Sequence, residues 1–253
     1  MKQAKTSMAV RAALIAVVLL LGSAAASLAA DTAVDEGRHL LARATDGFFN
    51  QSLDSPQLRD LLERSRDAFG RIDDGAARLY WQAEVAYLLG FVGQADERPR
   101  EAERSFEASR DLLLASLAQR PTSQAYRLLA DTYAQLLMLN GLLYKMSYGP
   151  KVREMAEEAL RLDPTNAKAR LTLALYYRNA PAIAGGSRAR SLELLHRLEG
   201  EQALEPVDRF SLNAWLGIAY SEVRRPLEAR RYLTQALEVY PGNTWLQGML
   251  AEL

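Results

Sequence analysis

One unit of 34 residues, Phe210 to Asn243, constrains the fold of this chain more than any other feature. Its apolar and small residues recur at spacings of three and four, which places them on one face of each of two successive helices. The pattern consists of Leu216, Gly217 and Tyr220 on the first helix, and of Ala229, Leu233 and Ala236 on the second, before Pro241. Because the apolar face of each helix carries glycine or alanine, the two helices can approach closely. The unit therefore predicts a closely packed antiparallel helix pair.

This unit resembles the tetratricopeptide (TPR) repeat in its small–large pattern, its length and its closing Pro-x-Asn at positions 241–243. Asn213 stands where that repeat usually has a leading tryptophan. Looser copies precede it, and residues 32–70 form one further helix pair. The earlier copies are marked by Leu173, Ala174 and Tyr177, by Leu129, Ala130 and Tyr133 with Ala159 and Pro164, and by Tyr87 with Ala102 and Phe106.

The sequence contains no stretch with the period-two alternation that is typical of strands. We therefore expect an all-α protein in which ten or eleven helices form antiparallel pairs, stacked as a TPR-like right-handed solenoid with inserted and extended helices. Residues 31–253 are expected to form a single domain, with residues 244–253 as its C-terminal cap.

The first 30 residues have the order of a Sec-type signal peptide. A basic start is followed by the apolar run Ala12 to Leu21 and then by small residues, with cleavage possible after Ala26, Ala29 or Ala30. An uncleaved anchor is the alternative interpretation. Since no second apolar run is long enough to cross a bilayer, the sequence predicts a periplasmic protein without a membrane span after cleavage.

The composition excludes several kinds of site. The chain has no cysteine, so it lacks disulfides, thiol chemistry and the cysteine of a lipoprotein. After removal of the predicted signal peptide, 28 basic and 31 acidic residues leave a net charge of −3, which offers no electrostatic basis for binding nucleic acid.

No catalytic motif is present, and the two histidines, His39 and His196, have no carboxylate or thiol at motif spacing. Neighbouring acids such as Glu157 and Glu158 are typical of a solvated face, and the arginines beside acids along the helices are expected on exposed faces. We expect a protein that is not an enzyme and holds no metal or cofactor.

Three departures from the repeat are candidates for a functional site. The helix from Ala102 extends to about Arg120, an apolar segment covers residues 136–148, and an apolar loop covers residues 179–187. The segment would coat a helix on all sides and must therefore be covered. We expect Pro181 and Ile183 of the loop to lie against it, while Gly185 and Gly186 supply backbone freedom and Ser187 caps the next helix.

Two interpretations of these departures remain open. The insertions either fill a thicker core or leave an apolar pocket or pore. In the second case the predicted ligand-binding residues are Met138, Leu142, Tyr144, Tyr148, Tyr177 and Ile183, because methionine and tyrosine suit such a lining.

The stretch from about residue 159 to residue 195 resembles the T component of TRAP transporters, a family of periplasmic TPR accessory proteins. The matching residues are Tyr176, Tyr177, Pro181, Gly185 and Gly186. The resemblance implies an exported helical protein with a pore for an apolar small ligand, which docks with a solute-binding protein.

The leading functional hypothesis is an exported scaffold that recognises another periplasmic or envelope protein through the concave face of its solenoid. The alternative is a TRAP-transporter-associated accessory protein that binds an apolar small ligand. A third hypothesis is a homo-oligomer that pairs end to end through an exposed Trp245 and Leu246.

Overall fold

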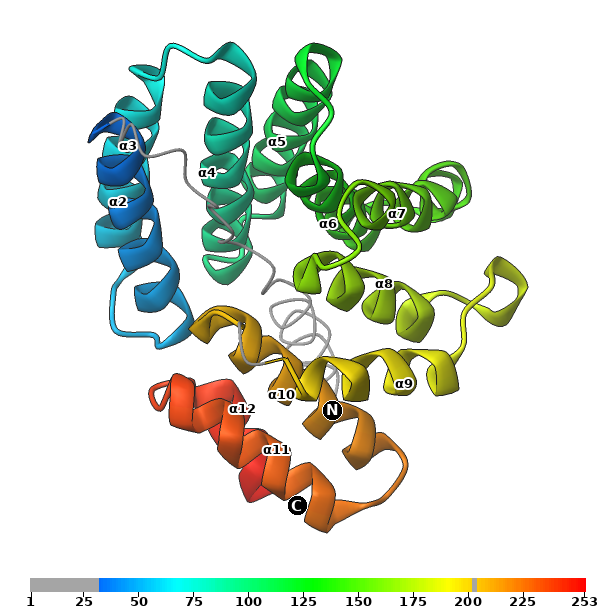
Figure 1. Cartoon of the computed structure of the whole chain (residues 1–253). Coiled ribbons are helices and arrows are strands. Elements are labelled where there is room, and N and C mark those ends of the chain that lie inside the picture. The colour runs from blue at the N-terminus through cyan, green and yellow to red at the C-terminus, as the bar shows by residue number, and fades with distance from the viewer. Residues whose placement is uncertain (1–31, 202–203) are drawn as a thin grey trace.

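The computed structural model describes residues 32–201 and 204–253, so the predicted signal peptide and its cleavage site lie outside the described residues. The side chains of Leu142, Leu143 and Met146 are likewise not described. The described residues contain eleven α-helices, one 3-10 helix and no strand, as Figure 1 shows. The helices are α2 (Thr32–Phe49), α3 (Ser55–Gly70), α4 (Gly75–Ala95), α5 (Pro99–Gln119), α6 (Ser123–Leu139), α7 (Leu142–Leu162), α8 (Ala167–Asn179), η1 (Ala182–Ala184), α9 (Arg188–Glu199), α10 (Pro206–Glu222), α11 (Pro226–Val239) and α12 (Thr244–Ala251).

The helices form five antiparallel pairs, α2 with α3 through α10 with α11, followed by α12. This arrangement confirms the predicted right-handed, TPR-like solenoid. The unit that led to the prediction is α10 with α11, and its small residues act as expected. A Cβ added at Gly217 would lie 2.6 Å from Leu233 Cδ2, so glycine is what allows the two helices to pack at this separation.

Local sequence signals explain where the helices begin and end. Asp54 caps α3, because its carboxylate accepts from the Gln57 backbone N–H and the Gln57 side chain accepts from the Asp54 backbone N–H. Ser187 caps α9 as predicted. Proline follows the ends of α5 and α11 at positions 121 and 241, where it cannot continue a helix.

Three helices, α4, α5 and α7, each have 21 residues. The end of α5 agrees with the prediction. The apolar segment 136–148 does not form one helix: α6 ends at Leu139, and α7 begins at Leu142 after Asn140 and Gly141. The segment therefore divides its side chains between two antiparallel helices, and it does not need to be covered on every side.

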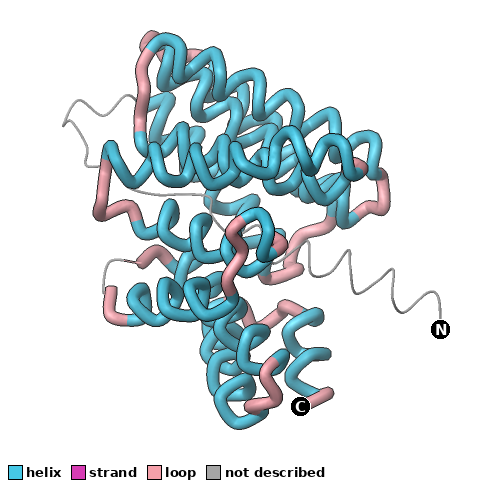
Figure 2. The backbone as a smooth tube through the Cα atoms, turned by 90° about the vertical axis from the view of Figure 1, so that its right-hand side faces the viewer, coloured by secondary structure: helices cyan, strands magenta, loops and turns pink. Residues whose placement is uncertain are grey.

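The solenoid closes on itself, so that its first and last helices meet (Figures 1 and 2). Tyr240 donates its hydroxyl hydrogen to Asp46 at 2.6 Å, and the Asn243 amide donates to the Phe49 carbonyl at 2.9 Å. The Phe49 ring lies 5.9 Å from that of Tyr240 and 5.7 Å from that of Phe210. We call this contact between the end of α2 and the α11–α12 turn the seam.

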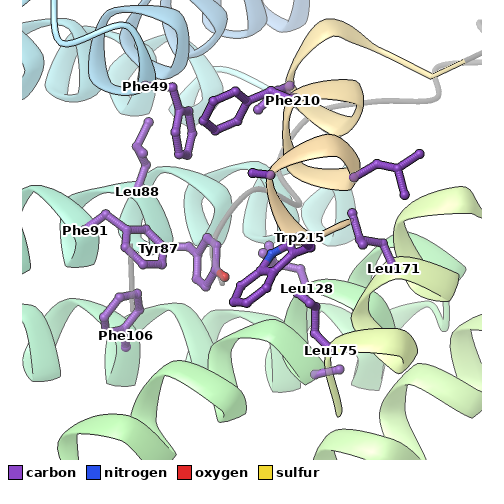
Figure 3. Packing of buried hydrophobic residues seen from close by; sticks show 14 of the residues in the cluster. Phe49, Tyr87, Leu88, Phe91, Phe106, Leu128, Leu171, Leu175, Phe210 and Trp215 are labelled. Carbon is purple, nitrogen blue, oxygen red and sulfur yellow. The ribbon is translucent and has the colours of Figure 1, made fainter. Parts of the chain in front are cut away.

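One hydrophobic cluster extends from Leu40 in α2 to Leu246 in α12. Figure 3 shows part of it, with Tyr87 of α4, Leu128 of α6 and Trp215 of α10 turned towards a common interior. Leu246 is fully buried, so the expectation that it is exposed for end-to-end pairing is wrong. No described helix has both the length and the apolar character needed to span a membrane.

Candidate functional site

The predicted ligand-binding residues fall into two separate places. Tyr144 and Tyr148 come together in the first half of α7, where their rings stack with centroids 4.3 Å apart, and Met138 lies near the end of α6. The Tyr133 ring lies 5.5 Å from that of Tyr148, and the Lys151 ammonium lies 4.8 Å from the Tyr148 ring centroid. Nothing is described of the Leu142 side chain, so its predicted role is not tested.

These tyrosines of α7 are half-buried beside a cation of α5. Burial raises the pKa of Tyr144, and the neighbouring Arg110 guanidinium partly opposes this shift. Met138 is 47% exposed. The first half of α7 thus carries an aromatic stack with a cationic rim, and its role in ligand binding stays a prediction.

Tyr177 lies on α8, where its ring packs under the Arg190 guanidinium at 5.1 Å and against Tyr176. Ile183 lies on η1 and is 98% exposed, with Pro181 also exposed. The expectation that Pro181 and Ile183 cover the methionine–tyrosine cluster is therefore wrong, because the loop projects into solvent (Figure 1).

Hydrogen bonds inside the loop explain why it projects. The amide N–H groups of Ala184 and Gly186 both donate to the Pro181 carbonyl, at 2.8 and 3.1 Å. The Tyr176 hydroxyl donates to the Ala184 carbonyl. Gly185 has a φ of +87°, as its expected backbone freedom requires. The backbone is thereby satisfied without burial of the apolar side chains.

The largest charged constellation lies inside the solenoid, on α4, α6 and α8. Arg127 is 1% exposed and donates to Glu84 at 2.9 Å and to Asp131 at 3.2 Å. Tyr80 also donates to Glu84, and Thr172 donates to Asp131 at 2.8 Å. We call these five residues the inner network. The expectation that arginines beside acids lie on exposed faces is wrong for Arg127.

A second buried ion pair continues the inner network towards α10. The Lys168 ammonium lies 3.7 Å from an Asp208 carboxylate oxygen and 3.3 Å from that of Glu205. Lys168 and Asp208 are both buried, whereas Glu205 is partly exposed. Charged side chains thus follow the inner helices α4, α6, α8 and α10 in sequence.

Burial shifts the ionisation of these groups towards neutral pH. Loss of hydration raises the pKa of Asp131 to about 7 and that of Asp208 to about 6, although Arg127 and Lys168 respectively oppose the shifts. Loss of hydration lowers the pKa of Lys168 to about 8, against the attraction of Asp208. Asp131 of the inner network and the adjoining Lys168–Asp208 pair can therefore change their charge between about pH 6 and pH 8.

The inner network also changes what the concave face can do. Arg127, Leu128 and Trp215 are all buried, so these three side chains are not available to a partner, and recognition through the concave face stays a prediction. Glu84 Oε2 and Asp208 Oδ1 have no hydrogen-bond partner among the described residues. Buried charges of this kind stabilise one arrangement of helices, because any other arrangement would leave them unpaired.

A partly exposed cluster on the outer side joins α9, α10 and α11. His196 contacts Glu199 through Nδ1 and the Tyr220 hydroxyl through Nε2, the latter at 2.8 Å. Tyr232 donates to Glu199 at 2.7 Å and stacks on Tyr220. This cluster was not predicted from the sequence, although Glu199 follows His196 at the i+3 spacing that permits contact on a helix.

Two hollows are described, and neither involves a predicted ligand-binding residue. One, of about 400 Å³, lies between α2 and α3 beside Arg43 and Asp60. The other, of about 360 Å³, lies at the seam. Aromatic and aliphatic side chains line most of it, among them Phe48, Phe49, Leu58, Val92, Phe210 and Trp245. No group of histidine, aspartate and glutamate residues that could hold a metal ion occurs in residues 32–201 and 204–253.

Solved structures of TPR proteins are similar to this fold. A thermophilic TPR protein from Thermus thermophilus aligns with a TM-score of 0.57 at 19% identity, over 85% of this chain and 97% of the other. The chain has a TPR-like fold. No protein-family model matches the sequence, and a comparison with curated proteins finds no significant relative.

Two other TPR-like structures align less closely. YrrB, described as a TPR protein with an unusual peptide-binding site, gives a TM-score of 0.36 at 14% identity over 90% of this chain and 100% of the other. PilF from Pseudomonas aeruginosa gives 0.34 at 14% identity over 88% and 100%. At these values they add nothing to the assignment of the fold, which depends on the Thermus protein.

Proposed function

We propose that this chain is an exported TPR-like scaffold of the periplasm or cell envelope that binds another protein. The observation that carries the proposal is the stack of five helix pairs, joined at the seam into a frame with a charged interior. Such a frame holds its outer turns in fixed positions, and binding residues are commonly placed on turns that a rigid scaffold supports.

Export is part of this proposal, and its support is the signal-like order of residues 1–30. The test compares the full chain with a variant that begins at Asp31, each carrying a C-terminal tag, by cell fractionation. We expect the full chain in the periplasmic fraction and the shortened chain in the cytoplasm. Equal distribution of the two would contradict export.

Partner binding is tested with the tagged full chain in its native cells. Mild cross-linking and purification should recover one protein whose amount saturates as the tagged chain is increased. The purified pair should then give a saturable binding curve. If no protein is recovered at either low or high salt, the scaffold function is wrong.

A second candidate function is a TRAP-transporter-associated accessory protein that binds an apolar small ligand and docks with a solute-binding protein. The observation that favours ligand binding is the largely apolar hollow of about 360 Å³ at the seam, a volume within the range of small-molecule sites. Its link to TRAP transporters is the resemblance around Tyr176 to Gly186.

Native mass spectrometry of the purified protein tests the second candidate, because a bound apolar species adds a discrete mass. Ala95→Trp should abolish that mass by filling the hollow, since Ala95 lines it. Ala189→Trp, at an exposed position of α9, is the matched control. Absence of any added mass in the natural chain would exclude this candidate.

A further inference from the structure

The outer turns of two adjacent pairs carry the most exposed apolar side chains among the residues described. Ile183 in the α8–α9 loop is 98% exposed, while Val223 and Leu227 in the α10–α11 turn are 55% and 80% exposed. Isolated apolar residues are common on surfaces, but a group of them on one edge marks an interaction site.

An ion pair joins the two helix ends from which these turns begin. Arg178, near the end of α8, donates to both carboxylate oxygens of Glu222 at the end of α10, with one contact at 2.8 Å. The Arg178 guanidinium also lies 5.2 Å from the Trp215 ring centroid. Arg178 is one residue from the end of α8, and Glu222 is the last residue of α10. The two turns that follow therefore begin on the same edge of the solenoid. We call this edge the turn surface.

Both turns are rigid, which favours recognition. The Ser187 amide N–H donates to the Tyr177 carbonyl at 2.7 Å, and the Arg225 amide N–H donates to the Tyr220 carbonyl at 3.0 Å. A Cβ at Gly186 would lie 1.8 Å from the Ala180 carbonyl oxygen, so the loop can fold this way only with glycine there. A surface that is already ordered loses little conformational entropy when it binds.

The charge of the turn surface selects the kind of partner. No acidic residue occurs between Asp163 and Glu193, and the exposed Arg188, Arg190 and Arg224 make no ion pair with a described residue. The two acids of the turn surface, Glu222 and Glu228, are paired with Arg178 and Arg225. The surface therefore has an excess of unpaired guanidinium groups, whose planar donors match carboxylates.

We propose that the turn surface is the docking site for an acidic protein partner, with Ile183 on one turn and Leu227 on the other as separate apolar contacts beside the exposed arginines. A protein fits better than a lipid surface, because the two turns contain none of the tryptophan, tyrosine or lysine residues that mark membrane interfaces. This proposal depends on the scaffold function and adds the surface and the chemistry of the partner.

The test places a photo-cross-linking amino acid at Ile183, at Leu227 or at Leu114 of the full chain in its native cells. Leu114 is an exposed leucine of α5 and serves as the matched position away from the turn surface. We expect protein adducts at Ile183 and Leu227 but not at Leu114, and a cross-linked partner segment that is rich in Asp and Glu.

The remaining outcomes separate the two proposals. Protein adducts at Leu114 alone, or recovery of a partner by the tagged chain without adducts at Ile183 and Leu227, would overturn the docking site and leave the scaffold function intact. Lipid adducts at the two turns would overturn it in favour of a membrane surface. A basic or neutral partner segment would also overturn it. Failure to recover any protein by either method would overturn both.

Affinity measurements with the identified partner complete the test. Ile183→Asp should weaken binding at least about tenfold, as loss of a central apolar contact does, while Leu114→Asp should leave it within about twofold. Arg188→Glu should weaken binding severalfold and reduce its dependence on salt, since it removes a charge that attracts carboxylates. Unchanged affinity of all three variants would contradict the docking site. Thermal melts will show that each variant is folded.

Discussion

The inner network and the α8–α9 loop show opposite relations between polarity and burial. Charged residues of α4, α6 and α8 lie in the interior, where Arg127 satisfies Glu84 and Asp131. The most apolar loop of the chain lies outside, with Ile183 almost fully exposed. The comparison shows that hydrogen bonding, and not polarity alone, determines whether these residues are buried or exposed. A charge can be buried when its partner is buried with it, and a loop can stay exposed when its backbone is internally bonded.

The largest effect should come from the inner network. Arg127→Ala leaves Glu84 and Asp131 buried without their cation, and we expect the free energy of unfolding to fall by about 3–5 kcal/mol. Arg64→Ala breaks an exposed pair with Asp60 and should cost at most about 1 kcal/mol. Urea denaturation followed by circular dichroism measures both. Similar losses in the two variants would show that the inner network is no more important than a surface ion pair.

The next effect should come from the loop. Gly186→Ala forces a Cβ against the Ala180 carbonyl and should lower the free energy of unfolding by about 1–3 kcal/mol. Gly149→Ala is the matched control, because Gly149 lies inside α7 with no atom within 4 Å of an added Cβ. It should raise stability by up to about 1 kcal/mol. Equal denaturation midpoints for the two variants would mean that the loop is not rigid.

Stability should also depend on pH through Asp131 of the inner network and through the adjoining Lys168–Asp208 pair. Folded Asp131 keeps its proton up to about pH 7, whereas an unfolded aspartate loses it near pH 4. Its contribution is therefore complete below about pH 4 and is lost as the pH rises to 7, and Asp208 acts in the same sense up to about pH 6. Lys168 has the opposite effect: its contribution to stability is lost as the pH falls from about 10 to about 8. Below that pH it adds no further change.

We therefore expect the free energy of unfolding to fall by about 2–4 kcal/mol between pH 5 and pH 7, since each group that is protonated only in the folded state lowers it by about 1.4 kcal/mol per pH unit. Asp131→Asn should flatten this dependence, and Asp60→Asn, at an exposed position, should leave it unchanged. Denaturation curves at several pH values measure the slope. If the unsubstituted protein became more stable between pH 5 and pH 7, the conclusion that folded Asp131 keeps its proton would be wrong.

The smallest effect on the free energy of unfolding should come from the exposed side chain of the α8–α9 loop. Ile183→Ser should change the free energy of unfolding by less than about 0.5 kcal/mol, because an exposed side chain loses no packing. A loss of 2 kcal/mol or more in thermal or urea denaturation would show instead that Ile183 is buried, as the sequence analysis expected.

Helical periodicity was enough to predict most of the fold. The pair of residues 32–70, the extended helix that ends before Arg120, and the unit from Phe210 to Asn243 all agree with the structure, because each depends on spacing within one or two neighbouring helices. The closure at the seam could not be predicted in this way. It depends on contacts such as that of Tyr240 with Asp46, between residues 194 positions apart in the chain.

The candidate sites were harder to predict for a similar reason. Arg127 and Asp131 have the i,i+4 spacing of a surface pair, and only the position of α4 beside α6 brings Glu84 to them. One signal was available, since Glu84 is the sole acid in the largely apolar α4. For the loop, apolar composition suggested burial, whereas Gly185 and Gly186 form a turn that satisfies its own backbone.

The meeting of α2 with the α11–α12 turn has a further consequence for how the molecule comes apart. A linear array of repeats can unravel from either terminus one unit at a time. Here the last unit is bonded to the first, so neither terminal unit can fray without breaking the Tyr240–Asp46 and Asn243–Phe49 hydrogen bonds. The protein should therefore unfold in a single cooperative transition, in which all five helix pairs are lost together.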